Sequence, residues 1–181
     1  MRVLVPLAEG VEELEAVTVI DVLRRGGIEV VSAALGSERE VGGSRGVTLL
    51  ADTVWDAVNP ATFDAITLPG GGQGTENLAA DSRVIAAVKA FAAAGKYVTA
   101  ICAAPTVLAK AGVLNGRRAT CYPACAEALG EAYDQAPVIA DGSFITSQGP
   151  GTAMLFALVL VQHFAGDETA RNVADSLLTS F

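Results

Sequence analysis

The amino-acid sequence predicts a flavodoxin-like α/β fold: a doubly wound, mostly parallel sheet with helices on both faces and an added β-hairpin. The main observation is that short apolar runs rich in β-branched residues alternate with longer runs of helical periodicity. Such alternation is typical of parallel strands joined by crossover helices. The 181 residues contain no internal repeat, low-complexity tract or long linker, so we expect a single domain over residues 1–181.

The predicted elements follow one another along the chain. The strand-like runs are RVLVPL (2–7), IEVVSAAL (28–35), FDAITLPG (63–70) and KYVTAIC (96–102), and the intervening or following helical runs are 11–25, 82–94 and 104–111. REVGGSRGVTLLAD (39–52) has two apolar stretches around a glycine-rich centre and predicts the added hairpin. A second short strand pair meets at the turn dipeptide Asp141-Gly142, and helices over 153–164 and 168–178 complete the chain.

Residue types at the predicted helix ends support these boundaries. Asp81 immediately precedes the run 82–94, and an aspartate there can accept a hydrogen bond from a free N–H of the first turn. Glycine, which favours the left-handed conformation that ends many helices, follows the helical runs at Gly26 with Gly27, at Gly95 and at Gly112.

Composition and charge restrict the classes of function. The net charge is -8, and Lys and Arg occur in no cluster longer than a pair, so we expect no binding to nucleic acid. The longest apolar run, 153–161, is shorter than the roughly 20 residues that a membrane span requires. The N-terminal residues meet glutamates too early for a secretory signal. We therefore expect a cytoplasmic protein with no membrane partner.

The cysteines and the histidine give little indication of a metal. Three cysteines are an odd number, which favours free thiols in a reducing compartment. Cys121 and Cys125 lie in CYPAC, but two thiols without clustered histidines cannot complete a tetrahedral site, so we expect no metal. His163, the only histidine, lies far along the C-terminal helix and is interpreted as a structural or surface residue.

Ligands of doubly wound sheets bind beyond the carboxyl ends of the strands. The turns to consider therefore hold residues 9–15, the glycine run 70–74, and Cys102. Cys102 follows YVTAI directly and precedes a helix, where free N–H groups and the helix dipole stabilise anions. This position predicts a thiolate; the alternative, which the junction alone does not eliminate, is a buried structural cysteine.

The other two turns carry weaker signals. LPGGGQG (68–74) can present backbone N–H groups to an oxyanion, or it can be an ordinary glycine turn; its spacing does not fit a nucleotide phosphate loop. Glu12 and Glu13 are expected to be solvated residues of a first helical turn. Glu15 shares a helix face with apolar residues, so its carboxyl is expected to be desolvated and protonated; a rim carboxylate is the alternative.

Taken together, these motifs resemble the ThiJ/PfpI superfamily, in the DJ-1 branch that includes the bacterial YajL-type proteins. The resemblance covers nearly the whole chain, and its residues occur in the family's order. They are EGVEELEAVTVIDVLRRGGIEV, GSRGV, FDAITLPGGGQGTENL, AICAAPTVLAKAGVL and ITSQGPGTAMLFAL.

This resemblance implies roles for individual residues. Cys102 would be the nucleophile on a sharp strand-to-helix elbow, and Glu15 a protonated glutamate bonded to its sulfur. Gly70, Gly71 and the Ala103 amide would form the oxyanion side of the pocket. The absence of a histidine at the position of Ala103 makes peptidase activity unexpected, because the protease-like branches resemble CHG there.

Two further positions follow from the same resemblance. Arg45 in GSRGV matches an arginine that approaches the pocket from a partner subunit, which implies a homodimer formed through the first helix and the hairpin. Tyr122 stands where the family often has a histidine before proline, so a Cys/His mechanism is disfavoured.

The branch implies a cofactor-independent enzyme for reactive dicarbonyls such as methylglyoxal, or for early glycation adducts. The Cys102 thiolate would attack the aldehyde carbon, Glu15 would move a proton between adjacent carbons, and Tyr122 would orient a substrate hydroxyl. The alternative is an oxidative-stress thiol sensor or protective chaperone in which Cys102 becomes a sulfinate, without a dedicated substrate. A hydratase or amidotransferase-like activity is a weaker third hypothesis.

Overall fold

The computed structural model describes all residues 1–181 and contains a seven-stranded sheet in the order β5-β2-β1-β6-β7-β9-β8. Its strands are β1 (Arg2–Leu7), β2 (Glu29–Ala34), β5 (Thr53–Val54), β6 (Ala65–Leu68), β7 (Tyr97–Ile101), β8 (Val138–Asp141) and β9 (Phe144–Ser147). All neighbouring strands are parallel except β8, which pairs antiparallel with β9. The predicted doubly wound fold is confirmed.

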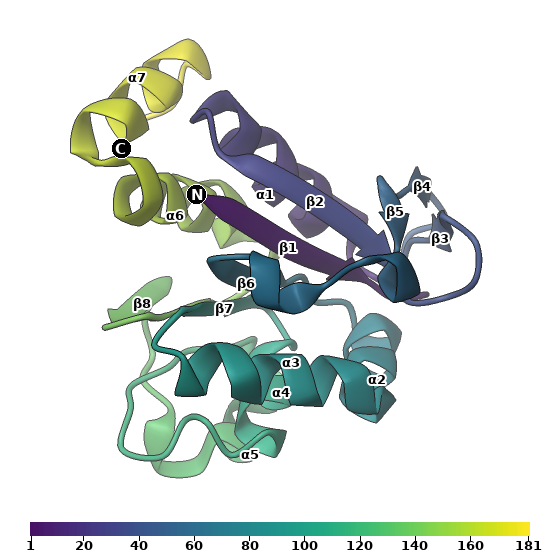
Figure 1. Cartoon of the computed structure of the whole chain (residues 1–181). Coiled ribbons are helices and arrows are strands. Elements are labelled where there is room, and N and C mark those ends of the chain that lie inside the picture. Colours follow the sequence, from purple (N-terminus) through teal and green to yellow (C-terminus); the bar gives the residue numbers. More distant parts are fainter.

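Helices cover both faces of the sheet (Figure 1). One layer contains α1 (Glu13–Arg25), α6 (Ala153–Ala165) and α7 (Asp167–Ser176), and the other contains α2 (Gly72–Ala80), α3 (Ser82–Ala93), α4 (Pro105–Lys110) and the short α5 (Ala126–Leu129). Five short 3-10 turns complete the elements, at Trp55–Ala57, Pro60–Thr62, Pro123–Cys125, Gly130–Ala132 and Pro150–Thr152.

The central strands are buried because their residues are apolar on both faces. In β1, Val3 and Val5 belong to the hydrophobic cluster under α1 and α6, whereas Leu4 belongs to the cluster under α3 and α4. This alternation is the period of two that an extended chain imposes. The sheet is therefore held between two separate hydrophobic cores, and its strand ends are fixed in position.

The added hairpin is present, but it does not extend the main sheet. Its strands β3 (Glu40–Gly42) and β4 (Thr48–Leu50) form their own two-stranded sheet. Backbone hydrogen bonds join it to the chain before α1: Gly10 N–H donates to Gly42 O at 2.8 Å, and Ser44 N–H donates to Val11 O at 2.7 Å. The hairpin is thus attached to the segment that leads into the first helix.

Most predicted helix ends are confirmed to within two residues. Asp81 caps α3 by accepting a hydrogen bond from Arg83 N–H at 2.8 Å, and Gly27, Gly95 and Gly112 have positive φ after their helices. Helix α2 was not predicted, because the glycine run indicated a turn; the helix begins at its third glycine, Gly72. The edge strand β5 was also not predicted.

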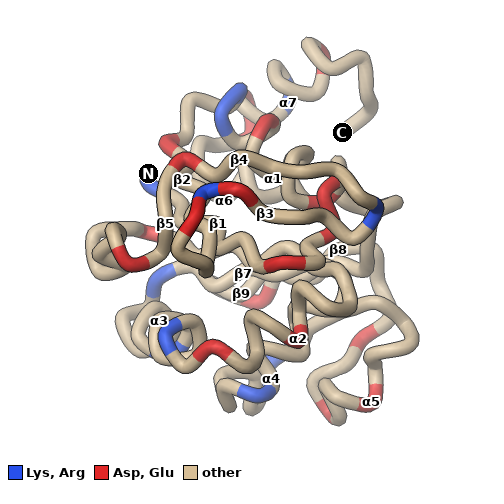
Figure 2. Tube along the Cα trace, turned by 90° about the vertical axis from the view of Figure 1, so that its right-hand side faces the viewer, with Lys and Arg blue, Asp and Glu red and all other residues tan.

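Charged residues are distributed over the surface of both layers. Figure 2 shows Lys and Arg as single positions or short pairs among Asp and Glu, in agreement with the net charge of -8. No helix is both long and apolar enough to cross a bilayer.

Candidate active site

The carboxyl ends of β6 and β7 place two of the predicted turns side by side. These strands are parallel and in register from Ala65 opposite Tyr97 to Leu68 opposite Ala100, so the glycine run after β6 lies next to Cys102. The start of α1 is held to the same edge, because Glu12 N–H donates to Gly70 O at 2.9 Å. All three predicted turns therefore meet at one place.

Cys102 lies on a strained elbow between β7 and α4. Its φ is +64°, which a residue with a side chain rarely adopts, and only one other non-glycine residue of the chain has a positive φ. The following residues Ala103 and Ala104 are small. Pro105 begins α4, and its missing N–H costs no hydrogen bond because the first N–H groups of a helix have no partner within the helix. Cys102 N–H is fixed by the carbonyl of Ser147 at 2.9 Å. The predicted strand-to-helix elbow is confirmed.

Glu15 is fully buried beside this elbow. Gly70 N–H donates to its Oε2 at 2.9 Å, whereas its Oε1 is buried with no hydrogen-bond partner. Burial raises the pKa of Glu15 to about 7, against the lowering effects of Gly70 N–H and of the Cys102 thiol. The prediction of a desolvated glutamate is confirmed, and protonation at Oε1 would convert the unsatisfied acceptor into a donor.

Close contact between these groups depends on glycine. A Cβ atom on Gly70 would lie 2.6 Å from Cys102 Cβ and 2.8 Å from Glu15 Oε2. Gly71 has a φ of +93°, and a Cβ atom there would lie 2.3 Å from the carbonyl oxygen of Gly10. The two glycines allow the backbone after β6 to approach both the thiol and the start of α1.

The charge state of Cys102 differs from the prediction. Burial and then the charge of Glu15 raise the pKa of its thiol, while the N–H groups of Gly71 and Ala103 lower it, and the result is a pKa of about 12. The predicted preference for thiolate is not favoured, because α4 has only six residues and burial outweighs the effect of its dipole. Burial raises the pKa of both groups, so the pair disfavours the form that carries two negative charges.

Tyr122 lies at the rim of the site. Its N–H donates to Cys102 O at 2.7 Å, and its side chain is 48% exposed. A Cβ atom on Gly149, the second residue after β9, would lie 3.4 Å from the Tyr122 ring and 3.9 Å from Cys102 Sγ. The loop after β9 thus borders the sulfur, a neighbour that was not predicted because SQGPGT (147–152) contains no titratable side chain.

Arg45 is not brought to Cys102 within one chain. Its side chain is 79% exposed, and its closest carboxylate oxygen is Glu12 Oε2 at 3.9 Å. The expectation that Glu12 and Glu13 are solvated is wrong, since both are buried against the hairpin. Glu13 accepts hydrogen bonds from the N–H groups of Arg45 and Val47, and these bonds lower its pKa although burial opposes them.

The remaining candidate residues lie outside the site. All three cysteines are free thiols, and burial raises the pKa of Cys121 to about 11, with a further contribution from the charge of Cys125. His163 is exposed and contacts Tyr97 edge to face, so its interpretation as a surface residue is confirmed. No three His, Cys, Asp or Glu side chains come together as a metal site would require.

Comparison with known proteins agrees with this geometry. The DJ-1/PfpI family matches residues 1–163, which include every residue of the candidate site. The chain belongs to the DJ-1/PfpI family. The sequence resemblance to this superfamily and to its DJ-1 branch is therefore confirmed.

Similarity to individual members of the DJ-1/PfpI family extends over nearly the whole chain. Protein dj-1beta of Drosophila melanogaster is 42% identical over 98% of this chain and 97% of its own length. Protein DJ-1 homolog B of Arabidopsis thaliana is 41% identical, but this chain spans only 41% of its length. Deglycase PYRAB04690 of Pyrococcus abyssi is 34% identical over 83% of this chain and 92% of its own.

The fold agrees with a solved member of the family. The oxidised form of Toxoplasma gondii DJ-1 superposes with a TM-score of 0.96, at 38% identity, over 99% of both chains. The seven-stranded sheet and its helices are thus those of the DJ-1 proteins.

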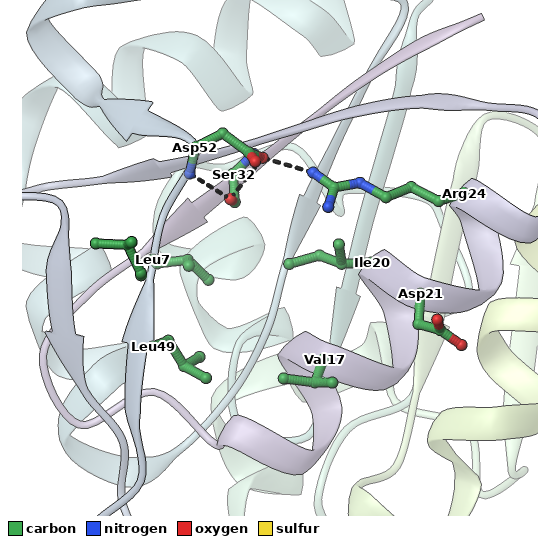
Figure 3. A pocket seen from close by; sticks show the side chains of 9 residues that line it. Leu7, Val17, Ile20, Asp21, Arg24, Ser32, Leu49 and Asp52 are labelled. Carbon is green, nitrogen blue, oxygen red and sulfur yellow. Dashed lines mark hydrogen bonds and ion pairs between the residues drawn. The ribbon is translucent and has the colours of Figure 1, made fainter.

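The sequence reasoning also missed an apolar groove between α1 and the hairpin. Figure 3 shows Leu7, Val17, Ile20 and Leu49 along this groove of about 270 Å³, with Arg24, Ser32 and Asp52 at one end. Asp52 accepts hydrogen bonds from Arg24 at 2.6 Å and from Ser32 at 2.8 Å. Arg24, Ser32 and Asp52 therefore satisfy one another at the polar end, and the rest of the groove is lined mostly by apolar side chains.

Proposed function

We propose that this DJ-1/PfpI family member is a cofactor-independent enzyme that acts on reactive dicarbonyls, or on early glycation adducts, as a glyoxalase or deglycase. One observation carries the proposal: the buried Glu15 Oε1 has no partner and lies beside a cysteine on a strained elbow. An unsatisfied buried acceptor is unfavourable for folding, and such groups are typical of sites that serve chemistry. The name of the deglycase from Pyrococcus abyssi gives independent support.

In this mechanism the pair of Cys102 and Glu15 supplies one nucleophile and one proton. The sulfur attacks the aldehyde carbon of methylglyoxal, forming a C–S bond, and the carbonyl oxygen takes a proton to give a hemithioacetal. The N–H groups of Gly71 and Ala103 stabilise the oxyanion that develops. Glu15 transfers its proton to the carbonyl oxygen as the negative charge moves there from the sulfur, so the site never holds two negative charges.

The second half of the reaction uses Glu15 as a base. Its carboxylate removes the hydrogen from the former aldehyde carbon, and the proton returns to the adjacent carbon to give a thioester. Water then cleaves the C–S bond, which releases a 2-hydroxy acid and regenerates Cys102. The overall reaction adds one water to the dicarbonyl, and no external oxidant or cofactor is needed.

Replacement of the nucleophile tests this proposal directly. Cys102→Ser is expected to abolish lactate formation from methylglyoxal, and Cys125→Ser, which changes a thiol outside the site, is expected to retain it. Lactate is measured enzymatically with purified protein. Undiminished turnover by Cys102→Ser would exclude the mechanism.

A thiol sensor or protective chaperone is the second candidate function. It is favoured by the same microenvironment, because the two oxygens of a Cys102 sulfinate would accept hydrogen bonds from a protonated Glu15 and from backbone N–H groups. The oxidised Toxoplasma gondii DJ-1 structure is consistent with it. Intact mass after graded peroxide distinguishes the roles: selective addition of two oxygens to Cys102, with negligible dicarbonyl turnover, favours the sensor.

We also propose that the chain forms a homodimer through α1 and the hairpin, which would bring Arg45 toward the partner's pocket. The support is that four exposed large apolar side chains gather on these two elements, at Leu14, Val17, Val47 and Leu50. The groove of Figure 3 lies between them and could receive apolar side chains of a second copy.

A further inference from the structure

A small apolar pocket of about 190 Å³ lies next to the candidate nucleophile, and no step above uses it. Its walls are Tyr122 with Pro123 on one side and the loop 148–152 on the other. The loop contributes mainly glycine and proline, so its surface is backbone and pyrrolidine ring. The pocket is a shallow depression open to solvent, and its volume exceeds the roughly 150 Å³ of an apolar cavity that binds benzene, so one aromatic ring can lie in it with part of its surface exposed.

Gly149 provides the opening between this pocket and the sulfur. An added Cβ atom would be in ordinary van der Waals contact with the Tyr122 ring at 3.4 Å and with Cys102 Sγ at 3.9 Å. The absence of a side chain therefore leaves a gap of about one methyl group between the ring and the sulfur. The φ of Gly149 is 163°, an extended value open to any residue, so glycine is not required there by the backbone.

Both walls of the pocket are fixed to the backbone of Cys102. On one side, Tyr122 N–H donates to Cys102 O at 2.7 Å. On the other, Cys102 N–H donates to Ser147 O at 2.9 Å, Ser147 Oγ is hydrogen-bonded to Thr152 Oγ1 at 2.7 Å, and Gly149 N–H donates to Thr152 Oγ1 at 3.1 Å. The pocket is thus preformed relative to the sulfur, as selective binding requires.

We propose that Tyr122 and Gly149 form a specificity subsite that binds the substituent on the ketone carbon of a 2-oxoaldehyde, and that it prefers a flat aromatic substituent to a methyl group. The inference rests on the proposed function, because it takes the carbon attacked by Cys102 as the aldehyde carbon. The Tyr122 ring would stack on the substituent, and Gly149 would let the chain between substituent and aldehyde pass to the sulfur. The side chain of Tyr122 therefore acts through its ring, and its hydroxyl is dispensable.

The decisive experiment measures access to the sulfur without turnover. Bromoacetone and phenacyl bromide are α-haloketones of the same reactivity class with a methyl or a phenyl substituent, and both alkylate thiols. Their rate constants at Cys102 are measured by intact mass and peptide mapping in the Cys125→Ser background. The phenyl-to-methyl rate ratio is divided by the same ratio for free cysteine, which removes the intrinsic difference between the reagents.

Four variants test the two walls. Since an aromatic pair contributes about 0.5–1.5 kcal/mol, Tyr122→Ala is expected to lower the normalised ratio about twofold to tenfold. Tyr122→Phe keeps the ring and is expected to keep the ratio. Gly149→Ala fills the gap and is expected to lower the ratio by at least as much as Tyr122→Ala. Gly36→Ala, outside the site with 4.0 Å to the nearest atom, is the matched control and is expected to change nothing.

The outcomes separate this inference from the proposed function. A normalised ratio that is the same in wild type, Tyr122→Ala and Gly149→Ala would overturn the subsite, even if dicarbonyls are converted. A ratio that falls as expected supports the subsite even if neither methylglyoxal nor phenylglyoxal is turned over, in which case only the proposed reaction fails. If the subsite and the proposed reaction are both correct, kcat/KM for phenylglyoxal relative to methylglyoxal falls in Tyr122→Ala by the same factor as the alkylation ratio.

Discussion

Gly70 is the residue on which the meeting of thiol and carboxyl depends most directly. A Cβ atom added to Gly70 would lie only 2.6 Å from Cys102 Cβ and 2.8 Å from Glu15 Oε2, so no larger residue fits at this position without a shift. The same residue donates its N–H to Glu15 and accepts the N–H of Glu12 at its carbonyl. One position without a side chain therefore holds the Cys102 thiol, the Glu15 carboxyl and the start of α1 in contact.

Gly70→Ala is expected to separate the pair and to reduce lactate formation from methylglyoxal at least about tenfold, since a displacement near 1 Å can cost about 100-fold. Circular dichroism shows whether the variant folds, and Gly36→Ala is the control for glycine replacement. A folded Gly70→Ala protein with wild-type turnover would contradict the importance of this contact.

Glu15 makes a definite prediction for stability. Because burial raises its pKa from 4.5 to about 7, the folded state binds its proton more tightly than the unfolded state. Below pH 4.5 Glu15 is protonated in both states, and its burial costs the folded state no charge. As pH rises from 4.5 to about 7, the free energy of unfolding falls by about 3 kcal/mol in total. Glu15→Gln cannot ionise and is expected to be more stable than wild type at about pH 8 and similar at about pH 4. Urea unfolding over this range measures the difference, and parallel pH curves for the two proteins would contradict the prediction.

The reactivity of Cys102 follows from the same coupling. The charge of Glu15 raises the pKa of the thiol, so Glu15→Gln is expected to shift the iodoacetamide alkylation profile of Cys102 to lower pH while dicarbonyl turnover falls. Peptide mapping assigns the modified cysteine. A profile that Glu15→Gln leaves unchanged would mean that the two side chains do not interact.

At the scale of elements, the junction between α2 and α3 depends on one cap. Asp81 ends α2, begins α3, accepts the N–H of Arg83 and forms an ion pair with its guanidinium. Asp81→Ala is expected to lower the free energy of unfolding by about 1 kcal/mol, whereas Asp81→Asn, which keeps a capping oxygen, is expected to lose less. Urea unfolding measures both. Since the hydrogen bonds and the ion pair of Asp81 all involve residues of α2 and α3, an altered alkylation rate of Cys102 in either variant would contradict a purely local role.

The elements that could be predicted from the sequence are those with a strong local pattern. The apolar runs of β1, β6 and β7 and the capped helix α3 carry their own signals. The apolar face of Glu15 left a rim carboxylate open as the alternative, and only the resemblance to the family favoured a place in the site. Helix α2 was missed because Gly72 and Gly74 disfavour a helix locally, and its place is set by packing of Gly74 on residues 10 and 11.

The errors within the site arise from contacts between distant segments. Glu13 was expected in solvent, but its hydrogen-bond donors Arg45 and Val47 are more than thirty residues away in the hairpin. The thiol of Cys102 was expected to ionise easily because a helix follows it, and its burial is a property of the assembled fold. A local pattern identifies such residues, whereas their charge states depend on partners that only the folded chain brings together.

At the scale of the whole molecule, the exposed apolar residues of α1 and the hairpin predict self-association. Val17→Asp would place a charge beside the groove of Figure 3 and is expected to convert a dimer into monomers. Leu178→Asp, which also replaces an exposed apolar side chain but lies near the C-terminus, is the control. Sedimentation equilibrium measures the mass, and a Val17→Asp protein that remains dimeric would show that this face is not the interface.

The backbone crossing of residues 10 and 11 with Gly71 and Gly74 has a consequence for how the family can diversify. A Cβ atom at Gly71 or Gly74 would lie within 2.3–2.8 Å of this neighbouring backbone, so main chain touches main chain with no side chain between. The frame that aligns acid and sulfur is thus independent of rim residues such as Tyr122. Substitutions at the rim can therefore reshape the surface around Cys102 over evolutionary time without disturbing the contact between thiol and carboxyl.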